Sequence, residues 1–164
     1  MLGAKTGAQT KGFILKSLKY LGADQTIVSD ASNTTFISSL NAVDLQPNKM
    51  YKVVWTLGTV SSPSAGLVWR MYLNYPSGFV SFVNHFGAGA GASPNTVTPS
   101  NGSLANTINP QLAVNNIFIC EFQAQIKMGS SSGNIEFGIR NVVAGSAQLL
   151  ADYTHVSVYE IVPT

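Results

Sequence analysis

The side chains that could perform catalysis or hold a metal ion are few and widely spaced. His85 and His155 are the only histidines. Neither has another histidine, a cysteine or a carboxylate at the spacing of a local metal motif, although zinc needs three or four ligands. Carboxylates that cleave glycosidic bonds must face each other, and Glu121 and Glu136 could do so only from neighbouring strands; we expect both on an outer sheet face. The seven carboxylates are scattered one per segment: Asp24, Asp30, Asp44, Glu121, Glu136, Asp152 and Glu160.

Two further patterns resemble phosphate-binding or reactive sites, and both are better explained by structure. Residues 87–92 (GAGAGA) fit the alanine-terminated dinucleotide fingerprint, but that motif needs a helix directly after it, and Ser93-Pro94 follows instead. The single cysteine, Cys120, excludes an intramolecular disulfide, and its alternation with apolar residues indicates a small buried hydrophobe rather than a nucleophile. No Gly-x-Ser-x-Gly elbow marks a nucleophilic serine. We therefore expect no enzymatic activity, no cofactor and no metal.

The composition predicts that part of the surface is covered by other protein molecules. Only 10% of the chain is charged, whereas 45% is hydrophobic, and a typical soluble domain is about 25% charged. A monomer would have to stay soluble largely on serine, threonine, asparagine and glutamine. Self-association or docking onto a partner is the simpler explanation.

The few charges are unevenly distributed. Four lysines precede the first acid, Asp24. We expect an extended N-terminal arm over residues 1–11 and a single β-sandwich domain over residues 12–164. The basic N-terminal region could grip an acidic partner, or it could be a solvated tail. The four lysines are Lys5, Lys11, Lys16 and Lys19.

Two classes of partner are not expected from the sequence. Arg70 and Arg140 are the only arginines and lie far apart, which argues against nucleic acid as the partner. No apolar stretch approaches the ~20 residues of a membrane-spanning helix. The N-terminal residues also lack the apolar core of an export signal.

Alternation of apolar and polar residues predicts strands. The clearest run covers residues 118–128 and a second starts at Tyr51; both show the period of two that is typical of half-buried strands. We expect residues 67–75 and 79–86 to form the two strands of a hairpin. No window has helical spacing, so eight or nine strands predict an all-β, antiparallel, jelly-roll-like β-sandwich with essentially no helix. Shorter strands are predicted at residues 13–20, 26–29, 34–40, 135–140 and 153–162.

Residues 87–112 have no charge and contain three prolines, which predicts a long loop. Such loops are uncommon in compact domains and are often functional, so this one is a candidate contact surface or else an excursion without a role. Aromatic rings in the central part of the chain could stack on sugars. Most of them must fill the core, but Trp69 and Tyr75 are candidates for facing a ligand.

Three segments together resemble a recurrent β-sandwich domain of tailed-phage virion proteins, found in tail-fibre tips and capsid decoration proteins. Residues 45–51 carry an L-x-P-N-K-x-Y turn, residues 133–140 a G-x-I-x-F-G-I-R strand, and residues 156–161 a V-x-V-x-E-I strand near the end of the chain. The resemblance spans about residues 34–162. Its motifs are structural and carry over no catalytic residue.

The resemblance implies a virion protein, on the capsid surface or the tail, that forms trimeric jelly rolls of the tumour-necrosis-factor type. A chain of this size with a basic arm and no fibrous repeat favours a capsid decoration (cement) protein. Its arm would lie across neighbouring subunits of the major capsid protein, and its trimer would plug a junction between capsomers. The alternative is a tail-fibre head that recognises host surface glycans through residues 87–112 or an exposed aromatic.

Overall fold

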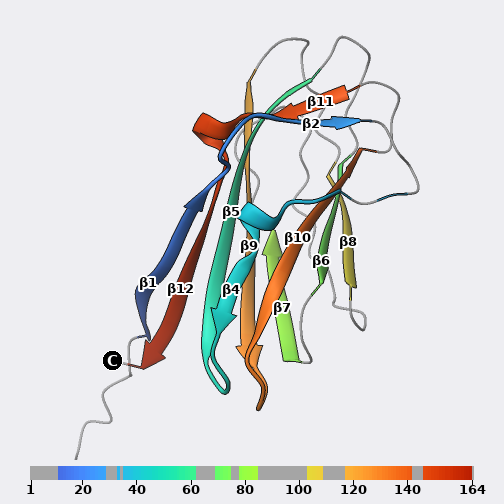
Figure 1. The fold of residues 1–164 in the computed structure, drawn as a ribbon. Coiled ribbons are helices and arrows are strands. Elements are labelled where there is room, and N and C mark those ends of the chain that lie inside the picture. The colour runs from blue at the N-terminus through green and yellow to red at the C-terminus, as the bar shows by residue number, and fades with distance from the viewer. Residues whose placement is uncertain are drawn as a thin grey trace, which may run out of the picture.

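The computed structural model describes residues 11–28, 33, 35–61, 69–74, 78–84, 103–108, 117–141 and 146–163 (Figure 1). Within these ranges the regular structure is twelve strands and two short 3-10 turns. The strands are β1 (Lys11–Tyr20), β2 (Gln25–Val28), β3 (Thr35–Phe36), β4 (Ala42–Leu45), β5 (Met50–Ser61), β6 (Trp69–Asn74), β7 (Gly78–Asn84), β8 (Ser103–Ile108), β9 (Phe118–Met128), β10 (Gly133–Asn141), β11 (Ser146–Leu149) and β12 (His155–Pro163), and the turns are η1 (Ser38–Leu40) and η2 (Ala151–Tyr153).

The strands form two antiparallel sheets. In the seven-stranded sheet, β1 pairs with β12, β12 with β5, β5 with β9 and β9 with β7, while β11 and β2 continue from the far end of β5 across one end of the molecule (Figure 1). In the five-stranded sheet, β10 lies between β6 and the short strands β3 and β4, and β8 pairs with β6. From β5 to β10 successive strands alternate between the sheets. The predicted all-β, jelly-roll-like sandwich with essentially no helix is confirmed.

One tryptophan joins the two sheets at the centre of the core. Trp55 of β5 is fully buried, and its ring lies 5.7 Å from that of Phe137 on β10 and 5.8 Å from that of Phe122 on β9. Its indole Nε1 donates a 2.8 Å hydrogen bond to the Leu40 carbonyl. The buried polar atom is therefore paired, as burial of an indole requires.

The period-two pattern gives the expected result on both long strands. On β9 every second side chain from Phe122 to Met128 is buried, and Gln125 and Lys127 between them are exposed. On β5 the buried apolar side chains that the structure describes are Tyr51, Val53, Trp55 and Leu57, and Thr59 continues the same alternation.

The L-x-P-N-K-x-Y segment forms a tight turn between β4 and β5. Pro47 takes the second turn position and Asn48 the third, with a φ of 58°, which is the left-handed conformation that a type II turn needs there. The Asn48 amide donates to the Gly129 carbonyl at 2.8 Å. The Tyr51 hydroxyl accepts a 3.0 Å hydrogen bond from the Gln46 amide, so the motif fixes the start of β5.

The segment that leads into β12 is attached to β5 at the point where β5 changes its pairing partner. β5 pairs with β12 up to Thr56 and with β11 from Thr59. At Gly58, between them, an added Cβ would collide with Tyr153 of η2. The buried hydroxyl of Thr154 accepts from the Gly58 amide at 3.1 Å and donates to its carbonyl at 3.3 Å. This close approach sets where β12 begins.

Several sequence-based expectations were wrong. Residues 67–75 and 79–86 do not form a hairpin, because β6 pairs with β10 and β8 while β7 pairs with β9 in the other sheet. The predicted loop at 87–112 contains β8, and the predicted strand at 34–40 is divided into β3 and η1. A turn-like sequence between two strands does not determine which strands pair, because partners are chosen by contacts distant in sequence.

Candidate interaction surface

The outer face of the seven-stranded sheet, on the side away from the core, carries a row of exposed apolar side chains. Phe13 is 56% exposed, Leu15 52%, Leu18 44% and Tyr20 58%. They lie opposite Ile161, Tyr159, Ser157 and His155 of β12, which alternate with the core residues Val156 and Val158. We call Phe13, Leu15, Leu18 and Tyr20 the outer row of β1.

A β-bulge produces this row. The pairing of β1 with β12 shifts between Leu15 and Ser17, so Lys16 has no partner opposite it. In an uninterrupted strand, alternate side chains share a face, and the residues after Leu15 on the outer face would be Ser17 and Lys19. The extra residue reverses the alternation, as bulges do when they redirect side chains. Leu18 and Tyr20 therefore lie outside.

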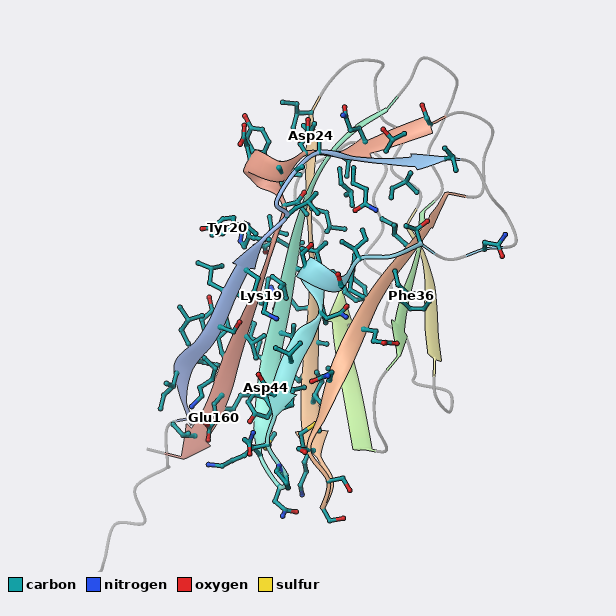
Figure 2. The ribbon with its side chains drawn as sticks, viewed as in Figure 1. Lys19, Tyr20, Asp24, Phe36, Asp44 and Glu160 are labelled. Atoms are coloured by element: carbon teal, nitrogen blue, oxygen red, sulfur yellow. The ribbon has the colours of Figure 1, made fainter. Side chains whose placement is uncertain are left out.

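The same bulge places Lys19 on the inner side of β1, where Lys16 also lies. Lys16 Nζ lies 3.3 Å from Glu160 Oε2, and Lys19 Nζ donates a 3.3 Å hydrogen bond to the Asn41 carbonyl beside η1. Figure 2 shows Lys19 and Tyr20 on opposite sides of β1. The outer row is consequently uncharged along its whole length.

Glu160 is a buried carboxylate that joins three chain segments. It accepts a 2.7 Å hydrogen bond from Lys49, the residue before β5, and forms an ion pair with Lys16 of β1. The hydrogen bond from Lys49 lowers the pKa of the Glu160 carboxyl below its ordinary value of 4.5. The same bond raises the pKa of the Lys49 ammonium above 10.5. The bulged middle of β1 is thus attached to the sheet by charge as well as by its ladder.

Beside the outer row the face is hollowed. A shallow depression of about 420 Å³ is lined by one β1 residue and by residues of β12, β5 and β9. Lys52 lies over the Phe13 ring, with Nζ 5.7 Å from its centroid, a distance at which a cation and an aromatic face attract each other. The lining residues are Phe13, Lys52, Val54, Glu121, Gln123 and Tyr159.

At the other end of the row, Tyr20 contacts a histidine. The rings of Tyr20 and His155 lie 5.4 Å apart at an angle of 44°. His155, expected to be an amphipathic sheet residue, is half-buried on the outer face. The apolar surface therefore extends from the depression to the opposite end of β1.

The predicted site residues fall in different places. Lys5 and Tyr75 lie outside the described residues, as does His85. Lys11 is the first residue of β1 and its backbone pairs with Pro163, so the predicted arm at 1–11 overlaps a strand by one residue. Trp69 begins β6. Partner binding by Lys5, Lys11, Lys16 and Lys19, and ligand contact by Trp69 or Tyr75, stay predictions.

The outer row was not predicted, although the sequence contained a signal for it. Large apolar residues at 13, 15, 18 and 20 are spaced by two, three and two positions. A strand interrupted by one extra residue has this spacing. Without the register, the same spacing is equally consistent with an irregular edge.

Two kinds of feature are absent from the described part of the chain. No group of three or more histidine, cysteine, aspartate and glutamate side chains is placed to hold a metal ion there. No helix in those segments has the length and hydropathy to cross a bilayer.

No protein-family model matches the chain, and a search of curated proteins found no match. Solved structures of similar shape include the tumour-necrosis-factor protein Eiger of S. frugiperda, at 10% identity and a TM-score of 0.45 over 93% of this chain and 94% of that one. They also include the VP2 subviral particle of infectious bursal disease virus, at 11% identity and a TM-score of 0.25 over all of this chain and 46% of that one. A lipoprotein of Bacteroides thetaiotaomicron matches at 8% identity and a TM-score of 0.22, over 96% of this chain and 92% of that one. Viral capsid proteins are thus among the similar structures, and similarity at this level concerns shape alone.

Proposed function

We propose that the protein is a non-enzymatic structural component of a phage virion: a homotrimeric capsid decoration (cement) protein that binds between capsid subunits and reinforces the shell. The observation that carries this proposal is the uncharged outer row of β1, at about half exposure along its length. A row of that kind on a sheet face is suited to being covered by protein. The partners are other copies of the chain and the major capsid protein.

The composition and the sequence resemblance support the same proposal. With 10% charged residues, the chain has little charge to place at an interface, and interface centres are depleted in charge. The three segments that resemble phage virion proteins include the turn into β5 and the strands β10 and β12. They build the sandwich rather than a reactive site.

Deletion of residues 1–10 tests the part of the proposal that assigns capsid binding to the N-terminal region. The deletion stops before Lys11, which opens β1, so the sheet is kept. We expect binding to purified capsids of the encoding phage to be lost while the oligomer measured by light scattering is unchanged. Binding that equals that of the full chain would contradict the role of this segment.

The alternative function, recognition of host glycans by a tail-fibre head, depends on residues that lie largely outside the described segments. Its proposed contacts are residues 87–112, Trp69 and Tyr75. A glycan array with the isolated chain separates the two functions, because a cement protein is expected to bind no glycan on it. Binding of one glycan class that a Trp69→Ala or Tyr75→Ala variant loses would favour the fibre head.

A further inference from the structure

We propose that the outer row of β1 is the surface by which one copy of the chain docks onto a second copy, and that the bulge at Lys16 serves to complete this row. The inference rests on the self-association in the proposed function and names the surface that carries it.

The first step is the effect of the bulge on the face. With an uninterrupted ladder the outer positions after Leu15 would be Ser17 and Lys19, both suited to water. The register shift exchanges them for Leu18 and Tyr20. Bulges interrupt pairing and are designed features rather than defects, and this one places two large apolar side chains on the face directed away from the core. The exchange is favourable only if another surface covers the row.

The second step concerns size. A large side chain exposes roughly 200 Å² when fully accessible, so four at about half exposure present on the order of 400 Å². Each partner in a standard protein interface contributes about 800 Å². The row supplies about half of that, and the adjoining depression lies on the same face.

The third step identifies a second copy as the occupant. The row carries no charge, and Lys52 and Glu121 in the depression are of opposite sign, so neither the row nor the depression offers a net charge to attract an acidic or basic partner. Lys16 and Lys19 are held on the inner side by Glu160 and the Asn41 carbonyl. The neutral row of one copy fits the charge-balanced depression of a second copy, and the row and the depression lie on the same face of the chain. Each copy therefore carries both halves of the contact.

The test introduces a charge into the row. Leu18→Glu and Tyr20→Glu are made separately, and mass in solution is measured by size-exclusion chromatography with light scattering. We expect the unmodified chain to be oligomeric and both variants to be monomeric. The matched control is Phe36→Glu, because Phe36 is 53% exposed but lies on β3 of the other sheet; this variant should stay oligomeric. Circular dichroism confirms that each variant is folded.

A milder variant keeps the test decisive if a glutamate prevents folding. The double variant Leu18→Ala, Tyr20→Ala shortens two half-exposed side chains. It should raise the dissociation constant between copies by about tenfold or more, as measured by sedimentation equilibrium. Unchanged association of the row variants would overturn the inference. A monomeric unmodified chain would overturn it as well, including one that binds capsids through the row.

Failure of the inference is distinguishable from failure of the proposed function. Capsid binding of the unmodified chain is measured in a separate sedimentation assay. An oligomer that depends on the row and binds no capsid supports the inference and contradicts the cement function. An oligomer that binds capsids and is unaffected by the row variants contradicts the inference and supports the cement function.

Discussion

At the scale of single residues, the side chain that most directly supports the candidate surface is Glu160. Its carboxylate is only 10% exposed and contacts two ammonium groups, from Lys16 and Lys49. Burial of a carboxylate is unfavourable unless it is paired and hydrogen-bonded. Because Lys16 is the bulge residue, the position of the bulge and the pairing of this buried charge depend on each other.

The pH dependence of stability should reflect this carboxylate. Its pKa is lowered in the folded state, so its contribution is fully present above the ordinary value of 4.5 and is lost as pH falls through the folded pKa. We expect Glu160→Gln to lower the melting temperature at neutral pH and to show a smaller loss of stability on acidification than the unmodified chain. Thermal unfolding between about pH 3 and about pH 8 measures both effects.

The control for this prediction removes a carboxylate that lies on the surface. Asp152→Asn changes the same charge at an exposed position on η2 and should leave the acid dependence nearly as it is. Equal curves for Glu160→Gln and the unmodified chain would contradict the assignment to Glu160.

At the scale of elements, the sequence predicted those features that depend on local alternation and missed those that depend on partners. The side chains from Phe122 to Met128 alternate strictly, and β9 buries them as expected. The pairing of β6 and β7 in different sheets was not predictable in this way, because the residues between them resemble a hairpin turn. The outer row was missed for the same physical reason: the face on which Leu18 lies is decided by the register with β12.

Deletion of Lys16 separates the row from the bulge. Leu15 and Ser17 pair with Tyr159 and Val158, which are consecutive on β12, so the deletion should give an uninterrupted ladder. Leu18 and Tyr20 then keep their outer positions, and we expect the variant to self-associate like the unmodified chain in light scattering. Its Glu160 loses one ion pair and keeps Lys49.

A matched insertion gives the opposite expectation. One alanine added after Ser17, with Lys16 kept, reverses the alternation of the residues that follow and should turn Leu18 and Tyr20 inward or force a second bulge. Self-association should weaken. If the deletion abolished association in a folded chain, the row would not be the contact.

At the scale of the whole molecule, the proposed contacts differ in their physics. The contact between copies is an uncharged row on a charge-balanced face, whereas the predicted contact with the capsid includes the lysines of the N-terminal region, among them Lys5 and Lys11. Salt screens interactions between exposed charges and leaves apolar burial intact or strengthens it. Ionic strength therefore distinguishes the two contacts within one preparation.

We expect the oligomer to persist in about 1 M sodium chloride, where the Debye length is only about 3 Å, while binding to capsids weakens progressively as salt is added. Light scattering measures the first quantity and capsid co-sedimentation the second, both on the full chain. An oligomer that dissociates in salt would show that charges hold the copies together, contrary to an uncharged row. Capsid binding that resists salt would assign that contact to an apolar surface instead of the lysines, because salt weakens any interaction that depends on exposed charge.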